Sequence, residues 1–190
     1  MRKIIVSNLI SLDGYYAGPN GEIDWFVNIA DKEFEEYSVN LINSVDTMLF
    51  GRITYELMES YWPNAKPEND DPRIIEAMNN YHKIVLSRSM EKVNWKNSIL
   101  INGEASDEAA KLKQKPGKDI VIYGSGRVVK SLMGKNLIDD YRIFVYPIIL
   151  GNGKRMFGKF DQRLNLKLVD TRKFKSGLVL LHYILQQNSI

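Results

Sequence analysis

The strongest constraint on the fold is a regular alternation of short apolar runs with amphipathic segments. Apolar, β-branched runs predict buried strands over residues 3–11, 46–50, 82–88, 98–102 and 119–123. Helical periodicity predicts helices over 52–62, 107–115 and 126–133, and another around a stripe at 34–42 that Asp31 would cap. Such alternation is typical of parallel βαβ units. The first two thirds of the chain therefore predict a mostly parallel sheet.

The last third of the chain has a different pattern. The run 140–150 predicts a long strand, with a bulge or a sheet edge at Pro147 because proline has no N–H to donate. Strict alternation over 163–170 and an apolar run over 177–186 predict an antiparallel hairpin. With no linker or repeat in the sequence, residues 1–190 are predicted to form a single mixed α/β domain.

Composition excludes several classes of function. The 190 residues carry a formal net charge of only +3, which gives no field that favours nucleic acid as a partner. Cysteine is absent, so disulfides and thiolate catalysis are excluded, and the histidines, His82 and His182, show no metal-ligand spacing. Polar residues interrupt the apolar start, and no segment is long enough to span a bilayer. We expect a cytoplasmic protein with no metal and no membrane partner.

Two strand ends carry residues suited to anions. Gly51 leads from a strand into a helix whose free N–H groups favour an anion, and Arg52 and Thr54 add a cation and a hydroxyl. Ser87 and Arg88 follow the next strand, where a hydroxyl and a guanidinium can hold a phosphate monoester. Each turn alone is equally typical of an ordinary polar connection.

A third strand end has the sequence Gly124-Ser125-Gly126. The glycines allow a backbone to approach phosphate oxygens, and Ser125 is a candidate cap for the helix that ends before Gly134, where a left-handed residue is expected. Val129 stands where the Rossmann fingerprint needs its third glycine. Together the three turns predict a site for a dinucleotide with a 2′-phosphate, since ligands of open α/β sheets bind at the carboxyl ends of strands.

The same segments carry a family resemblance that extends over nearly the whole chain. The chain resembles the dihydrofolate reductase superfold and, more closely, the C-terminal reductase domain of riboflavin-biosynthesis deaminase-reductases. The resemblance rests on the joint order of "SLDGYYA", "DW", "FGRITYE", "VLSR", "YGSGRVVKSLM" and "FVYPIILGNGKRMF". It implies a three-layer α/β/α fold with a mostly parallel central sheet and a C-terminal antiparallel hairpin, a homodimer, and NADPH as cofactor. The implied NADPH contacts are Gly51, Arg52, Thr54, Ser87, Arg88, Gly124, Ser125, Gly126, Arg127 and Val128.

The substrate side is predicted from the same resemblance. Asp13 and Asp24 frame the loop that covers the nicotinamide in this superfold, so both are candidate catalytic groups, though each is also an ordinary turn residue. Trp25 and Tyr55 are candidate substrate contacts that equally suit the core. In dihydrofolate reductases a helix carboxylate of the protein holds the pterin. The equivalent position here is Ala30, which disfavours dihydrofolate as the substrate.

Two functions of different classes follow. One is an NADPH-dependent reductase of a small, flat heterocycle, pterin-like or aminopyrimidine-like, or of a related imine or carbonyl. Such an enzyme would resemble 5-amino-6-(5-phosphoribosylamino)uracil reductase and dihydrofolate reductase. The other is a non-catalytic nucleotide-binding or interaction protein that retains the dinucleotide cradle. Oxidation of NADPH with candidate acceptors separates them.

Overall fold

The computed structural model describes residues 1–26, 31–158, 160 and 162–186. The strands are β1 (Ile4–Ser11), β2 (Tyr15–Ala17), β3 (Val45–Gly51), β4 (His82–Leu86), β5 (Ser98–Ile101), β6 (Asp119–Tyr123), β7 (Asp140–Tyr146), β8 (Lys154–Arg155), β9 (Leu166–Lys173) and β10 (Val179–Leu185). The α-helices are α1 (Lys32–Asn43), α2 (Arg52–Tyr61), α3 (Pro72–Asn80), α4 (Ala105–Gln114) and α5 (Gly126–Met133). Short 3₁₀ turns lie at Asp24–Phe26 and Trp62–Asn64.

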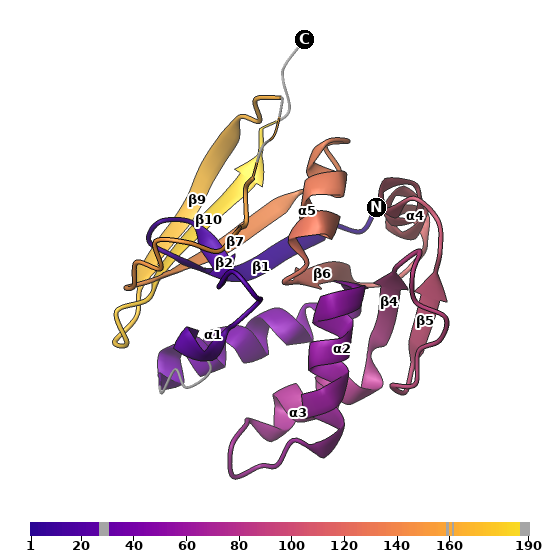
Figure 1. The fold of residues 1–190 in the computed structure, drawn as a ribbon, viewed down its shortest axis with the longest axis horizontal. Helices are drawn as coiled ribbons and strands as arrows, with labels where there is room; N and C mark the ends of the chain where they lie inside the picture. The colour runs from indigo at the N-terminus through magenta and orange to yellow at the C-terminus, as the bar shows by residue number, and fades with distance from the viewer. Residues whose placement is uncertain (27–30, 159, 161, 187–190) are drawn as a thin grey trace.

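Eight strands form one sheet in the order β5-β4-β3-β6-β1-β7-β10-β9 (Figure 1). The six strands from β5 to β7 pair in parallel, whereas β10 is antiparallel to both β7 and β9. This is the mostly parallel sheet with a C-terminal antiparallel hairpin that the sequence predicts. Strands β2 and β8 pair with each other in a separate two-stranded ribbon.

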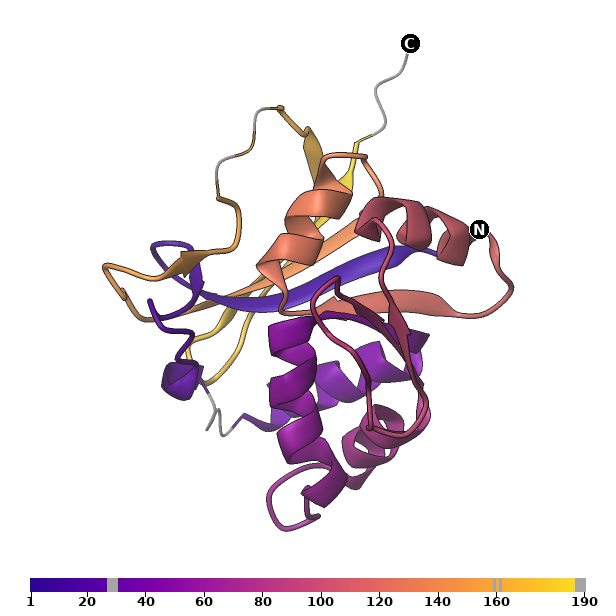
Figure 2. The same cartoon turned by 45° about the vertical axis from the view of Figure 1, so that its right-hand side comes forward.

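Helices cover both faces of the sheet, with α4 and α5 on one side and α1, α2 and α3 on the other (Figure 2). Successive side chains of a strand point to opposite faces, so Ile4 and Val6 of β1 pack in the core under α5 while Ile5 packs in the core on the opposite face. Burial on both faces explains the continuous apolar runs of the central strands. The three-layer α/β/α architecture is confirmed.

The start of α1 follows the sequence signal. Asp31 is the N-cap, and its carboxylate accepts hydrogen bonds from the backbone N–H groups of Glu33 (3.0 Å) and Phe34 (3.2 Å). The same carboxylate accepts from the Ser176 N–H at 2.7 Å, which ties the helix to the turn between β9 and β10. That bond is the main reason why the pKa of Asp31 is lowered.

Several local predictions need correction. Strand β7 ends at Tyr146, so Pro147 terminates the strand instead of causing a bulge within it. Gly134 has φ −60°, and the left-handed residue after α5 is Asn136 (φ 54°). Strand β9 is exposed along its whole length, although its alternation indicates a half-buried strand.

Two elements have no counterpart among the predicted helices and strands. Helix α3 begins at Pro72 behind the capping side chain of Asp71, which accepts from the Arg73 N–H at 2.8 Å. Strand β2 lies within the Gly-rich segment 12–24, where its pairing with β8 is non-local and leaves no local signal. Among the described residues, no helix has the length and apolar character to cross a membrane.

Candidate functional site

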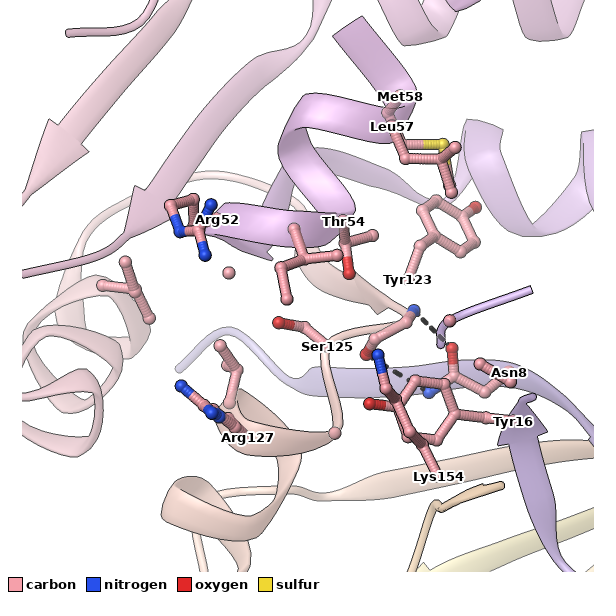
Figure 3. A pocket seen from close by; sticks show the side chains of 18 of the residues that line it. Asn8, Tyr16, Arg52, Thr54, Leu57, Met58, Tyr123, Ser125, Arg127 and Lys154 are labelled. Carbon is pink, nitrogen blue, oxygen red and sulfur yellow. Dashed lines mark hydrogen bonds between the residues drawn. The ribbon is translucent and has the colours of Figure 1, made fainter. Parts of the chain in front are cut away.

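A cavity of about 940 Å³ opens where the parallel strands β3, β4 and β6 end. Its wall includes all ten residues that the sequence assigns to a dinucleotide: Gly51, Arg52, Thr54, Ser87, Arg88, Gly124, Ser125, Gly126, Arg127 and Val128. They come from three strand ends that are far apart in the sequence and adjacent in the sheet. Figure 3 shows part of this wall. Ligands of open α/β sheets bind at such an edge.

Two helix starts meet in the cavity wall. Helix α2 begins directly after Gly51, and α5 begins directly after Ser125. A Cβ on Gly51 would collide with the Ser125 hydroxyl in its present position, so the two turns lie in close contact here. The unpaired N–H groups at a helix start attract anions, and Arg52 and Arg127 stand in the first turns of these helices. This part of the wall can hold phosphate groups.

The turn before α5 has an unusual backbone. Gly124 (φ 64°) and Ser125 (φ 60°) are both left-handed, which costs glycine little and serine more. The Asn8 side chain fixes this turn, because its carbonyl oxygen accepts from the Gly124 N–H and its amide donates to the Gly124 carbonyl at 3.5 Å. Ser125 occupies the N-cap position without a capping hydrogen bond. The predicted side-chain cap is therefore wrong, and Ser125 contributes to the cavity wall instead.

Arg88, after β4, and Arg52, at the start of α2, each form an ion pair with a carboxylate. The Arg88 guanidinium forms an ion pair with Glu104, and Arg52 pairs with Glu56 at 3.1 Å along α2. The Arg88 side chain is 68% exposed, so solvent screens its pair and the guanidinium can exchange partners at low cost. Ser87 accepts weak hydrogen bonds from the Ser89 and Met90 N–H groups, which shapes the turn after β4.

The other part of the wall is apolar and aromatic. Leu57 and Met58 of α2 and Tyr123 at the end of β6 lie together there (Figure 3). Ile23 and Phe26 extend this surface from the segment after β2. Such a surface suits a flat ring that is removed from water.

Tyr16 is a further aromatic residue of the wall. Its ring packs against Gly126 at the start of α5. Burial raises the pKa of Tyr16, against the opposing effects of the Gly126 N–H and the charge of Arg127. Burial likewise raises the pKa of Tyr123. Both phenols are therefore neutral hydrogen-bonding groups around neutral pH.

The two candidate catalytic carboxylates lie outside the residues that line the cavity. Asp13 accepts hydrogen bonds from the Ser11 hydroxyl (2.6 Å) and from the backbone N–H groups of Leu150 (3.1 Å) and Gly151 (2.8 Å). These bonds, the Ser11 hydroxyl first, lower the pKa of Asp13. Asp13 thus anchors the loop that leads into β8. Asp24 is exposed at the start of a 3₁₀ turn.

The candidate substrate contacts Trp25 and Tyr55 also lie outside the lining residues. Trp25 packs edge-to-face on Phe26 and Tyr146. Tyr55 is completely buried, and its hydroxyl accepts from the Asn94 and Trp95 N–H groups at 3.1 and 2.9 Å. Ala30, the position relevant to dihydrofolate, lies outside the described residues.

Several wall residues lack a clear signal in the sequence. They are Asn8, Tyr16, Leu57, Met58, Tyr123 and Lys154. Asn8 interrupts an apolar strand, which is the one local hint of a special role. Leu57 and Met58 fit the periodicity of a packed helix, and Lys154 lies in the two-residue strand β8, far from the other wall residues in sequence. No group of three or more histidine and acidic residues capable of holding a metal occurs within the part of the chain that the structure describes.

Comparison with protein families decides the relationship. The model of the RibD C-terminal domain matches residues 2–180. The chain belongs to the RibD C-terminal domain family. Two Bacillus subtilis proteins share this length of sequence: YyaP is 35% identical over 96% of this chain and 94% of its own length, and YwjB is 31% identical over 96% and 98%.

Solved structures show the same fold as this RibD C-terminal domain. A putative riboflavin biosynthesis protein from Shewanella sp. PV-4 superposes with a TM-score of 0.76 at 27% identity, covering 97% of this chain and 99% of that one. A Thermotoga maritima deaminase and 5-amino-6-(5-phosphoribosylamino)uracil reductase superposes with a TM-score of 0.69 at 15% identity. This chain covers 57% of the Thermotoga protein, so the match concerns one part of a longer enzyme.

Proposed function

We propose that the protein is an NADPH-dependent reductase of a small heterocyclic substrate. One observation carries the proposal: ten residues chosen from the sequence as dinucleotide contacts all lie in the wall of one cavity. Membership of the RibD C-terminal domain family supports a reductase, since the Thermotoga relative of this fold carries a reductase name.

The residues fit the cofactor. The close approach of Gly51 and Ser125 brings two helix starts to one wall, which suits a pyrophosphate. Ser87 and Arg88 would hold the 2′-phosphate, and Arg52 and Arg127 would add positive charge. When bound, NADPH supplies a hydride from its nicotinamide ring.

The remaining wall sets the class of substrate. Leu57, Met58 and Tyr123 offer an apolar surface that binds a flat ring, orients it and excludes water. We propose a pterin-like or aminopyrimidine-like substrate, or a related imine or carbonyl. The proposed homodimer rests on the family resemblance, and the proposed cytoplasmic location rests on the sequence. Sedimentation at two protein concentrations measures the oligomeric state.

The test combines binding with turnover. We expect the purified protein to bind NADPH and to oxidise it when candidate pterins, aminopyrimidines and small cyclic carbonyls are supplied. Binding of NADPH without oxidation by any acceptor would favour a non-catalytic nucleotide-binding protein. Absence of NADPH binding would remove the basis of the proposal.

A further inference from the structure

The cavity contains one lysine, Lys154, to which neither the sequence nor the family resemblance assigns a role. It differs from the cavity arginines in position and in pairing. Arg52 and Arg88 have carboxylate partners, and Arg127 is exposed at the start of α5. Lys154 is half-buried, and its ammonium has no ion pair or hydrogen bond among the described residues. Its positive charge is therefore available to a ligand.

The fold directs Lys154 into the cavity. Strand β8 pairs with β2, with Ala17 opposite Lys154 and Tyr15 opposite Arg155. Arg155 turns toward Tyr15, whose hydroxyl accepts from it at 3.0 Å, and it does not line the cavity. Lys154 does line the cavity, and its Nζ lies close to Gly21.

In the view of Figure 3, Lys154 is separated from Arg52 and Arg127, and it overlaps Tyr16, which belongs to the paired strand β2. The end of its side chain thus lies in a part of the wall away from the two arginines. No acidic side chain of the described wall lies in that region, because the one wall carboxylate, Glu104, is paired with Arg88. A cation in a half-buried site without a carboxylate attracts negative charge on a ligand.

The neighbouring loop is built to hold this lysine in place. Asp13 accepts hydrogen bonds from the N–H groups of Leu150 and Gly151, four and three residues before the lysine along the chain. Met156, on the other side of Lys154, donates its N–H to the Gly14 carbonyl at 3.1 Å. Backbone hydrogen bonds on both sides therefore fix the position from which Lys154 extends.

We propose that Lys154 binds the acceptor at the atom that gains negative charge and supplies its proton. This rests on the proposed function. When a hydride from the cofactor adds to the carbon of a C=O or C=N bond, the π electron pair moves to oxygen or nitrogen. That atom takes a proton from the Lys154 ammonium, and water returns a proton to the lysine; the cofactor leaves as NADP⁺. The substrate class is an acceptor with a polarised C=O or C=N bond.

The first experiment measures charge recognition without turnover. Benzoate is a flat ring whose carboxylate mimics the developing negative charge, and benzamide is its neutral counterpart. Calorimetric titration is done with the free protein and with the NADP⁺-saturated protein. We expect benzoate to bind more tightly than benzamide, and Lys154→Met to weaken benzoate about 10-fold to 100-fold while leaving benzamide unchanged. Lys154→Arg, which retains the charge, should retain benzoate binding.

The second experiment separates Lys154 from the cofactor site. Lys154→Met should bind NADPH within about twofold of the wild type and lose about 100-fold in kcat with any acceptor the wild type reduces. Lys130→Met is the control, since Lys130 is exposed on α5 outside the cavity wall.

Three results would overturn the assignment: equal benzoate affinity in the wild type and Lys154→Met, no preference of the wild type for benzoate over benzamide, or a tenfold loss of NADPH affinity in Lys154→Met. The last would make Lys154 a cofactor contact. Failure of the wild type to bind NADPH would contradict the proposed function. It would leave the Lys154 assignment testable, because benzoate is also titrated into the free protein.

Discussion

The side-chain amide of Asn8 brackets the peptide groups of Gly124, accepting from its N–H and donating to its carbonyl. Asn8 is 5% exposed and stands on β1, next to the strand that delivers the glycine turn. The bracket holds two successive left-handed residues, which few backbones adopt without support. It couples the interior of the sheet to the proposed pyrophosphate cradle.

Replacing Asn8 with leucine should therefore weaken the binding of NADPH. The change keeps the volume but leaves the Gly124 N–H without its acceptor, at a cost of about 1–3 kcal/mol shared between folding and binding. We expect the NADPH Kd to rise about tenfold by titration. The exposed Asn80→Ala, remote from the cavity, serves as control. An unchanged Kd in Asn8→Leu would show that the turn keeps its shape without the bracket.

The wild type should prefer NADPH to NADH. On the proposed function, Arg88 would exchange Glu104 for the 2′-phosphate, and one charge-assisted contact is worth about 1.5–3 kcal/mol, or roughly 10-fold to 150-fold in Kd. Arg88→Ala should remove most of this preference, because it should weaken the binding of NADPH and leave the binding of NADH unchanged. Arg73→Ala, which removes an exposed arginine paired with Glu36, should not change it. Equal affinities of the wild type for both cofactors would contradict the assignment of this turn.

Asp13 and Asp24 should differ in their effects. Asp13→Ala releases the loop that leads to β8, so turnover should fall about tenfold through misplacement of Lys154 while NADPH affinity stays within about threefold. Asp24→Asn changes an exposed side chain outside the cavity wall and should affect neither quantity. Steady-state kinetics with any accepted substrate measures both. A large loss of kcat in Asp24→Asn alone would return the proton donor to that carboxylate.

Lys83 makes stability depend on pH. This completely buried ammonium donates to the carbonyls of Met78 (2.9 Å), Asn79 (3.2 Å) and Tyr81 (2.8 Å) and lies 4.5 Å from the centre of the Trp95 ring. Burial lowers its pKa to about 8. Below that pH the group is charged in both states, and between about 8 and 10.5 the unfolded chain binds more protons than the folded one.

The contribution of Lys83 to stability should therefore rise as the pH rises through this window, by on the order of 2 kcal/mol. Chemical denaturation of the wild type and Lys83→Met at several pH values measures it. The difference between the two should change across the window, because other titrating groups are common to both proteins. A difference that stays constant would mean that the three carbonyls offset the burial and keep the pKa near its ordinary value.

Calorimetry should show one unfolding transition for residues 1–190. All strands except the β2–β8 ribbon belong to one continuous sheet, and cores on both faces share its central strands. Two separated transitions, or a stable proteolytic half, would contradict a single domain.

Sequence alone predicted the turns that line the cavity, but it did not predict the apolar part of the cavity wall. Gly51 and Ser125 stand at strand ends, where glycine, hydroxyl and helix periodicity combine into a readable local pattern. Leu57 follows the same periodicity as a packed core residue, so only the fold shows that it faces a cavity. Asp13 looks the same in sequence whether its carboxylate faces a ligand or neighbouring N–H groups, since loop side-chain directions depend on distant backbone.

The sequence also predicted some elements of the fold and missed others. Strands on both sides of β1 followed from apolar runs, because burial on two faces leaves a strong signal. The alternation of strand β9 correctly predicted a hairpin with β10, but its leucines are exposed: Leu168 is 51% exposed in the structure. Helix α3 was missed because Pro72 after Asp71 resembles a loop, although proline behind an acidic cap is also how a helix starts.

The contact between the Gly51 backbone and the Ser125 side chain also constrains how this chain can diverge. The Ser125 hydroxyl occupies the space that a side chain at Gly51 would need, so a larger residue there requires this hydroxyl to move. A substitution in one turn therefore acts directly on the other. The two turns, some seventy residues apart in the printed sequence, are therefore inherited as a single unit, and recombination between relatives that separates them should yield poorly functioning hybrids.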